Sequence, residues 1–163
     1  MKKVLLAIFL VMFVSFPAFA AWTVSAKLVS AYDYGADAKM MQFSIAVTSD
    51  ASSSGDITLS DELRTTYGTA MGNSYVNQMK GGILYAVEYV PDGTDTPTTA
   101  GRMTIDTAYG TNIFDETIST AGTGEVFDGT VDSNFNVPLT DVIFACTTLA
   151  NTKKATFYIW IIR

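Results

Sequence analysis

Four aspartates on two acidic stretches carry the chemistry best suited to bind a cation. Asp92 and Asp95 flank Gly-Thr, and Asp128 and Asp132 flank Gly-Thr-Val. Carboxylate oxygens on loops are ligands that Ca²⁺ prefers. Neither stretch has the full calcium-loop pattern with a distal Glu, and Asp-Gly is also an ordinary turn signal. We therefore expect turns at both places, with calcium as the alternative and no other cofactor.

Two tyrosines offer the best sites for stacking against a sugar ring. Tyr32 and Tyr34 alternate with Asp33 just before Gly35, in a stretch expected to form a loop. An aromatic ring on a loop presents an apolar face with a polar tip. Tyrosine is also common in strands, where it serves packing alone. The pair is therefore a candidate ligand-binding site if the protein binds carbohydrate.

The residues needed for catalysis are scarce. The chain has no histidine, which removes the commonest general base and transition-metal ligand. No Ser-x-x-Lys or Gly-x-Ser-x-Gly motif is present. Glu62, Glu88, Glu116 and Glu125 could serve a two-carboxylate mechanism, but their spacing does not pair them. The sequence therefore predicts a protein that is not an enzyme.

The first twenty residues are typical of a secretory signal peptide. Lys2 and Lys3 precede an unbroken apolar run, and Ala18-Phe-Ala20 supplies the small-x-small pattern of a cleavage site. The apolar run is short for the roughly 20 residues that span a bilayer, which argues against a retained anchor. We expect residues 1–20 to be a signal peptide and residues 21–163 a single domain. The protein is then exported across the inner membrane to the periplasm, the cell surface, the medium or a virion.

The charge of the exported domain narrows its partners. The whole chain carries −6, and removal of Lys2 and Lys3 leaves eight basic against sixteen acidic residues, a net charge of −8. A negative field repels phosphate, so we expect neither nucleic acid nor membrane as a partner. Cys146 is the only cysteine and cannot form an internal disulfide. We expect a buried thiol there, with a disulfide between chains as the alternative.

The hydrophobic pattern has a period of two along most of the mature chain. Alternation of this kind indicates half-buried strands. Expected strands lie at residues 22–29, 41–47, 83–90, 102–106, 112–118, 137–146 and 155–162. Short strands separated by Gly, Pro, Asp and Thr turns favour an all-β fold, an antiparallel β-sandwich or a small barrel.

Two connections are less regular. Residues 56–80 predict one short helix, with Ser60 as its cap and acids in the first turn, or an irregular connection. The last two strands are expected to pair as a hairpin across residues 148–154.

The final strand is apolar on both faces, where a surface strand would alternate. Phe157 to Ile162 is either a central strand covered on both sides within the chain or a strand covered on one face by another subunit. The second interpretation predicts an interface formed by Phe157, Ile159, Trp160 and Ile161.

Several short segments together resemble a family of small β-rich proteins encoded among tailed-phage and prophage structural genes. The matching segments are residues 57–61, 82–91, 97–98, 103–106 and 154–163. The family's patterns are Gly-x-Leu-Tyr-x-Val, Val-Pro, Pro-Thr into a Thr-(Ile/Leu)-x-Asp strand, for which this chain has Thr104-Ile105-Asp106, and a closing strand ending in Arg. The resemblance covers about residues 56–163 and implies a virion-type structural role. Such proteins do not usually carry a signal peptide, and residues 109–112 depart from their pattern.

The sequence as a whole favours a non-enzymatic structural or assembly protein, a virion-like or cell-surface β-sandwich subunit. Its expected partners are further copies of itself or other structural subunits. The alternative is an exported module that binds carbohydrate or calcium.

Overall fold

The computed structural model describes residues 23–33, 39–49, 55–97, 101–107, 110–118, 124–128, 137–147 and 153–163. The predicted signal peptide lies outside these residues. In chain order the elements are β1 (Thr23–Asp33), β2 (Lys39–Thr48), β3 (Gly55–Thr58), α2 (Leu59–Tyr67), α3 (Thr69–Met79), β4 (Ile83–Pro91), β5 (Gly101–Thr107), β6 (Gly110–Ile118), β7 (Glu125–Asp128), β8 (Ile143–Cys146) and β9 (Lys154–Ile162).

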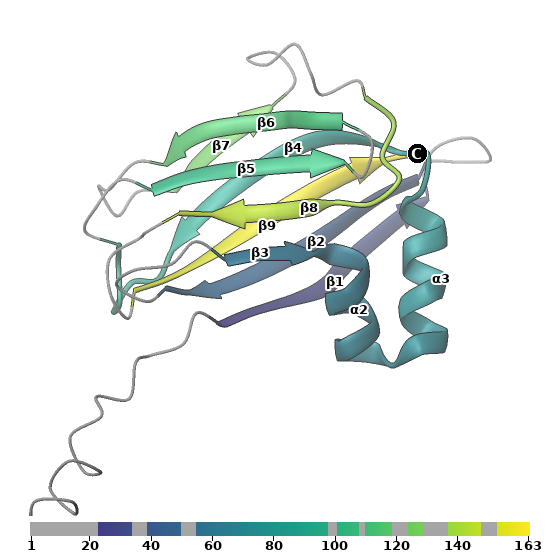
Figure 1. Cartoon of the computed structure of the whole chain (residues 1–163), viewed down its shortest axis with the longest axis horizontal. Coiled ribbons are helices and arrows are strands. Elements are labelled where there is room, and N and C mark those ends of the chain that lie inside the picture. The colour runs from purple at the N-terminus through teal and green to yellow at the C-terminus, as the bar shows by residue number, and fades with distance from the viewer. Residues whose placement is uncertain are drawn as a thin grey trace, which may run out of the picture.

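The strands form two layered antiparallel sheets (Figure 1). The five-stranded sheet has the order β1-β2-β9-β4-β7, and the four-stranded sheet, nearer the viewer in Figure 1, has the order β3-β8-β5-β6. Within the described residues the sheets do not close into a barrel. The prediction of an all-β sandwich is therefore confirmed.

The core lies between the two sheets and is rich in aromatic side chains. Phe157 on β9 lies between Phe144 on the opposite sheet and Tyr89 on the neighbouring strand, with ring centroids 5.0 and 5.4 Å away. All three side chains are buried. This contact joins the two sheets at β9, which lies at the centre of the larger one.

The segment predicted to hold one short helix contains two. Gly68 separates α2 from α3 with φ +79°, a conformation that favours glycine. A Cβ added to Gly72 would lie 2.6 Å from the Cα of Arg64, so glycine is what lets the two helices approach closely. Neither helix is long and apolar enough to cross a membrane, a finding that covers the described residues alone.

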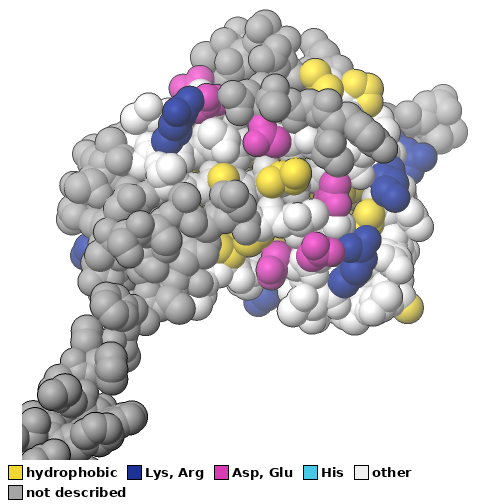
Figure 2. Space-filling view, viewed as in Figure 1, with side chains coloured by type: hydrophobic (Ala, Val, Ile, Leu, Met, Phe, Trp, Pro, Cys, Tyr) yellow, Lys and Arg dark blue, Asp and Glu magenta, His cyan; other side chains and the backbone are white. Residues whose placement is uncertain are grey.

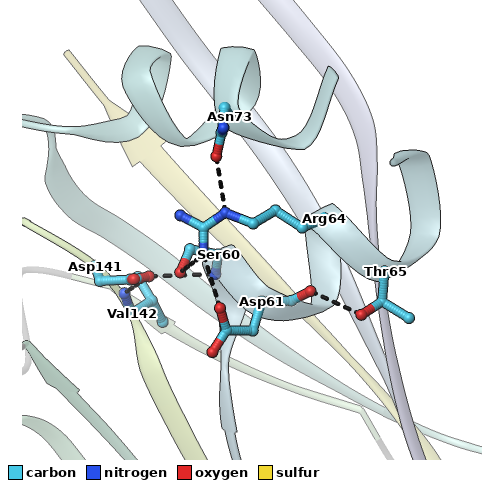
Figure 3. A network of polar contacts seen from close by, with 7 residues as sticks. All are labelled: Ser60, Asp61, Arg64, Thr65, Asn73, Asp141 and Val142. Atoms are coloured by element: carbon cyan, nitrogen blue, oxygen red, sulfur yellow. Dashed lines mark hydrogen bonds and ion pairs between the residues drawn. The ribbon is translucent and has the colours of Figure 1, made fainter. Parts of the chain in front are cut away.

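The prediction of Ser60 as the helix cap is wrong, because the cap comes from a residue far along the chain. Asp141 Oδ1 accepts hydrogen bonds from the backbone N–H of Ser60 at 3.3 Å and of Val142 at 2.8 Å (Figure 3). The residue before the helix, Thr58, makes no capping hydrogen bond with its side chain. The start of α2 is thereby fixed to the segment that leads into β8.

Arg64 holds the two helices together. Its Nε donates to Asn73 Oδ1 at 2.8 Å, and its Nη1 donates to Asp61 Oδ1 at 2.7 Å and to Ser60 Oγ at 3.2 Å (Figure 3). The contacts to Asp61 and Ser60 are within α2, whereas Asn73 lies on α3. The hairpin is therefore stabilised by specific polar contacts that compensate for the modest helix propensity of its Thr and Gly residues.

Two predictions about the strands are corrected. β8 pairs with β3 and β5, whereas β9 pairs with β2 and β4, so the last two strands lie in different sheets and form no hairpin. Non-local pairing of this kind leaves no local signal in the sequence. β8 begins at Ile143 and not at Val137, since Pro138 forms only an isolated bridge with Ile83.

Helix α2 covers part of the open edge of the larger sheet. Thr66 Oγ1 donates to the carbonyl oxygen of Ala26 at 3.0 Å, and the N–H of Leu28 donates to the Tyr67 hydroxyl at 3.2 Å. The same hydroxyl is 3.4 Å from the Leu28 carbonyl oxygen, to which it donates. These backbone groups lie on edge strand β1, so α2 occupies positions where another strand would pair.

Replacing Tyr67 with Phe should weaken this protection. The variant leaves both Leu28 backbone groups without their partner, and we expect a loss of about 1 kcal/mol in the free energy of unfolding. Amide hydrogen exchange should become faster at Leu28. Both quantities are measured by denaturant titration and exchange mass spectrometry.

Tyr75→Phe is the matched control. Tyr75 contacts Tyr67 edge to face with ring centroids 5.1 Å apart. The Tyr75→Phe variant keeps the aromatic ring of residue 75 and makes no change at β1. The backbone amide of Leu28 should therefore exchange its hydrogen at the wild-type rate. Equal exchange at Leu28 in Tyr67→Phe and wild type would show that α2 does not protect the edge.

Candidate functional site

The outer face of the five-stranded sheet is the side turned away from the four-stranded sheet. Strand register sets its composition, because side chains alternate between the two faces of a strand. On β9 this face carries Thr156, Tyr158, Trp160 and Ile162, all half-buried, while the residues between them are buried in the core. We call this face the outer face.

The apolar side chains of the outer face extend across neighbouring strands. Ile162 pairs with Met40 on β2 and with Ile83 on β4, and Met40 pairs with Tyr32 on β1. Tyr32 is 55% exposed, Tyr85 at the β4 register shift 49%, and Val126 on β7 66%. Ile162, Met40, Ile83 and Tyr32 thus form an apolar group at one end of the outer face, and such a group can mark an interaction surface.

The outward side of the four-stranded sheet has different chemistry. Arg102 on β5 forms a bidentate ion pair with Asp115 on β6. The hydrogen bonds from Arg102 lower the pKa of the Asp115 carboxyl. Figure 2 shows this side of the molecule, where acidic and basic side chains alternate with small apolar spots on the visible surface. This side is a typical solvated face, whereas the outer face of the larger sheet carries partly exposed Tyr158, Trp160 and Ile162 on its central strand.

The structure separates the four predicted interface residues. Phe157, Ile159 and Ile161 are fully buried in the core of the chain itself. Trp160 lies on the outer face, where it pairs in register with Gln42 on β2 and Ala86 on β4. An interface at β9 would therefore use Trp160 with Tyr158 and Ile162, and not the three core residues.

The predicted aromatic loop is in part a strand. Tyr32 lies in β1 opposite Met40, so its exposed ring belongs to the outer face. Tyr34 lies outside the described residues. β1 ends at Asp33, four residues beyond the strand predicted at residues 22–29, with a register shift between Leu28 and Ser30.

The predicted metal ligands Asp92 and Asp95 form a turn. Asp92 Oδ1 accepts the backbone N–H of Thr94 at 2.8 Å and of Asp95 at 2.9 Å, while Lys154 Nζ donates to Asp95 Oδ2 at 2.7 Å. These amides, Asp95 first, lower the pKa of the Asp92 carboxyl. Asp128 is the last residue of β7, and Asp132 lies outside the described residues. Within the described residues no three acidic or thiol side chains are grouped to hold a metal.

An open hollow of about 380 Å³ lies at the end of the outer face next to this turn. Hydroxyl groups in its lining come from Tyr158, Thr48 and Thr156. The Lys154–Asp95 ion pair lies at the edge of the hollow. Ala46 and Val90 belong to its apolar lining. The hollow combines an aromatic ring with paired charges and hydroxyls, a composition that suits an uncharged polar ligand.

Two buried ionisable groups lie in the core and have the properties of packing residues. Burial raises the pKa of the Cys146 thiol to about 12, and burial with the nearby Cys146 and Glu125 raises that of Tyr89 to about 12. Both groups are therefore neutral at physiological pH. A neutral buried thiol is a poor nucleophile, which agrees with the expected inert Cys146.

The grouping of side chains on the outer face could not be predicted from the sequence. Lys27, Ser44, Tyr158 and Glu88 lie in one row across four strands. Their positions within each strand follow from the period of two, but the row itself depends on register between distant strands. A second hollow of about 470 Å³ includes Arg64 and Asp141, whose contacts described above fix the helical hairpin.

No known family model matches this chain, and no curated protein is significantly similar to it.

Asp92→Ala should lower the melting temperature at pH 7, because Thr94 and Asp95 lose the acceptor for their N–H groups. The folded-state pKa of Asp92 is lowered from 3.8, so its stabilisation is present above that pH and is lost as the pH falls through the folded value. The difference between variant and wild type should accordingly shrink in acid. Thermal melts from pH 7 to pH 2 measure it, with Glu62→Ala on α2 as control.

Calcium provides a separate test of the turn. Lys154 pairs with Asp95, and two backbone N–H groups donate to Asp92, so these carboxylates already have partners and millimolar calcium should leave the melting temperature unchanged. A calcium-dependent rise that disappears in Asp92→Ala would instead support the calcium-binding alternative.

Proposed function

We propose that this protein is a non-enzymatic structural subunit that functions after export by associating with further copies of itself through the outer face. The observation that carries the proposal is the row Tyr158, Trp160 and Ile162 on the central strand β9. The backbone of β9 is paired on both edges, but these side chains project from the face of the sheet and are only half-buried.

The cost of leaving such a surface in water supports this proposal. Burial of apolar area contributes about 25 cal/mol per Å², so covering aromatic side chains on this face would contribute several kcal/mol to association. The charged outward side of the other sheet does not offer a comparable gain. The two sides of the sandwich thus differ in what they can bind.

Two features of the sequence favour the same class of function. The resemblance to phage structural proteins over residues 56–163 suggests a virion-like or cell-surface role. The predicted signal peptide favours assembly outside the cytoplasm.

Carbohydrate binding is the second candidate, and the hollow beside the Asp92 turn favours it. Tyr158 offers a ring for stacking, while Thr48 and Thr156 offer hydroxyl groups to a sugar. Tyr32 lies on the same face but near its opposite end, opposite Met40. A sugar site here would use Tyr158 and not the predicted pair Tyr32 and Tyr34.

Trp160→Glu should disrupt the assembly. A charge in the middle of an apolar interface commonly costs 2 kcal/mol or more, so we expect association to weaken by at least about 30-fold. Light scattering after size exclusion, over a range of protein concentrations, measures the mass. Circular dichroism checks that the variant is folded, and Tyr85→Glu on the same face provides a second disruption.

Met71→Glu is the matched control, because Met71 is 51% exposed and lies on α3, which is not part of the five-stranded sheet. It should associate as the wild type does. If the wild type is a monomer at every concentration, the assembly proposal is wrong, and oligosaccharide titration of the Tyr158 hollow becomes the next test.

A further inference from the structure

One row of the outer face carries opposite charges at its two ends. Lys27 on β1 pairs with Ser44 on β2, Ser44 pairs with Tyr158 on β9, and Tyr158 pairs with Glu88 on β4. Lys27 is exposed, and Glu88 is half-buried. The row therefore runs from a cation through a small residue and a large residue to an anion.

These two charges are too far apart to pair within one chain. Three strand spacings separate them, or about 14 Å. The Debye length in physiological salt is about 8 Å, so their attraction inside the chain is screened. Among the described residues neither side chain takes part in an ion pair.

We propose that a second copy of this chain covers the outer face in a two-fold symmetric, face-to-face dimer whose axis runs along the strands between β2 and β9. This proposal rests on the proposed function and specifies its geometry. Rotation about that axis places β1 of one copy over β4 of the other. Lys27 of each copy then faces Glu88 of the other, giving two interchain ion pairs.

Side-chain sizes fit the same arrangement. The axis places β2 of one copy over β9 of the other, so Gln42, Ser44 and Ala46 face a strand that carries Tyr158 and Trp160. Smaller side chains on one strand leave room for larger ones on the other. Self-complementarity of this kind is required of a two-fold interface.

The other way to align the strands is unfavourable. A two-fold axis across the strands would place each strand over its own copy. Lys27 would then face Lys27, Glu88 would face Glu88, and the large residues of β9 would meet each other. Like charges in contact are destabilising, so charge selects the axis along the strands.

The area of the outer face is sufficient for a stable dimer. In this arrangement β1, β2, β9 and β4 overlap with the second copy, whereas β7 lies outside the contact. Four strands spaced by about 4.8 Å and the nine residues of β9 at about 3.3 Å each give roughly 19 by 30 Å, or about 570 Å² of each copy. The two copies together would bury about 1,100 Å², above the roughly 1,000 Å² that a specific interface requires. Two sheets packed face to face lie about 10 Å apart, within reach of Lys and Glu side chains.

Charge reversal tests this geometry on protein expressed from the whole sequence of residues 1–163 and purified after export. Lys27→Glu and Glu88→Lys should each weaken dimerisation by about tenfold at low salt, because each places two like-charged pairs at the interface. The double variant restores opposite charges and should return to within about threefold of the wild type. Light scattering and analytical ultracentrifugation measure the dissociation constants.

A zero-length carbodiimide cross-link gives a second readout. It should join Lys27 to Glu88, and a mixture of ¹⁵N-labelled and unlabelled protein should show by mass spectrometry that the linked peptides come from different chains. A double variant as weak as the weaker single variant, or absence of this cross-link in a dimer, overturns the geometry.

The Trp160→Glu variant separates this inference from the proposed function. If Trp160→Glu abolishes association while charge reversal has no effect, copies associate through the outer face in another arrangement, and only the geometry is wrong. If the wild type itself stays monomeric, both are wrong.

Discussion

The alternation of side chains along β9 is the constraint on which the rest of the structure depends. Phe157, Ile159 and Ile161 fill the space between the sheets, and Phe157 contacts Phe144 across it. Because β9 is paired on both edges, it cannot rotate about its axis to bury the side chains on its outward side. The core that stabilises the sandwich therefore also places Tyr158, Trp160 and Ile162 on the opposite side, where the single chain leaves them half-exposed.

The helical hairpin covers part of one edge of the five-stranded sheet. Thr66 and Tyr67 occupy backbone groups at the edge of β1, which hinders the addition of another strand there. Arg64 and Asp141 in turn hold the hairpin against the sandwich. The partly covered edge of β1 and the Arg102–Asp115 ion pair on the other sheet are the reasons why we propose the outer face as the surface that binds another copy.

Local patterns in the sequence predicted the sandwich but not its connections. The period of two located most strands, and Pro91 with the following Asp-Gly located the turn after β4. One short helix was predicted where the structure has two, because both helices depend on tertiary contacts. The most important of these contacts is made by the distant Asp141 at the start of α2. The apolar character of both faces of β9 was visible in the sequence, whereas the row that joins Lys27 to Glu88 required the register of four strands.

Fluorescence of Trp160 tests the central claim most directly. In a Trp22→Phe variant Trp160 is the only tryptophan, so its emission reports on the outer face alone. If a second copy covers this face, emission should shift to shorter wavelength and become protected from acrylamide as concentration rises through the association range. Emission and quenching that stay constant across an observed change in mass would show that the chains associate elsewhere and would contradict the account.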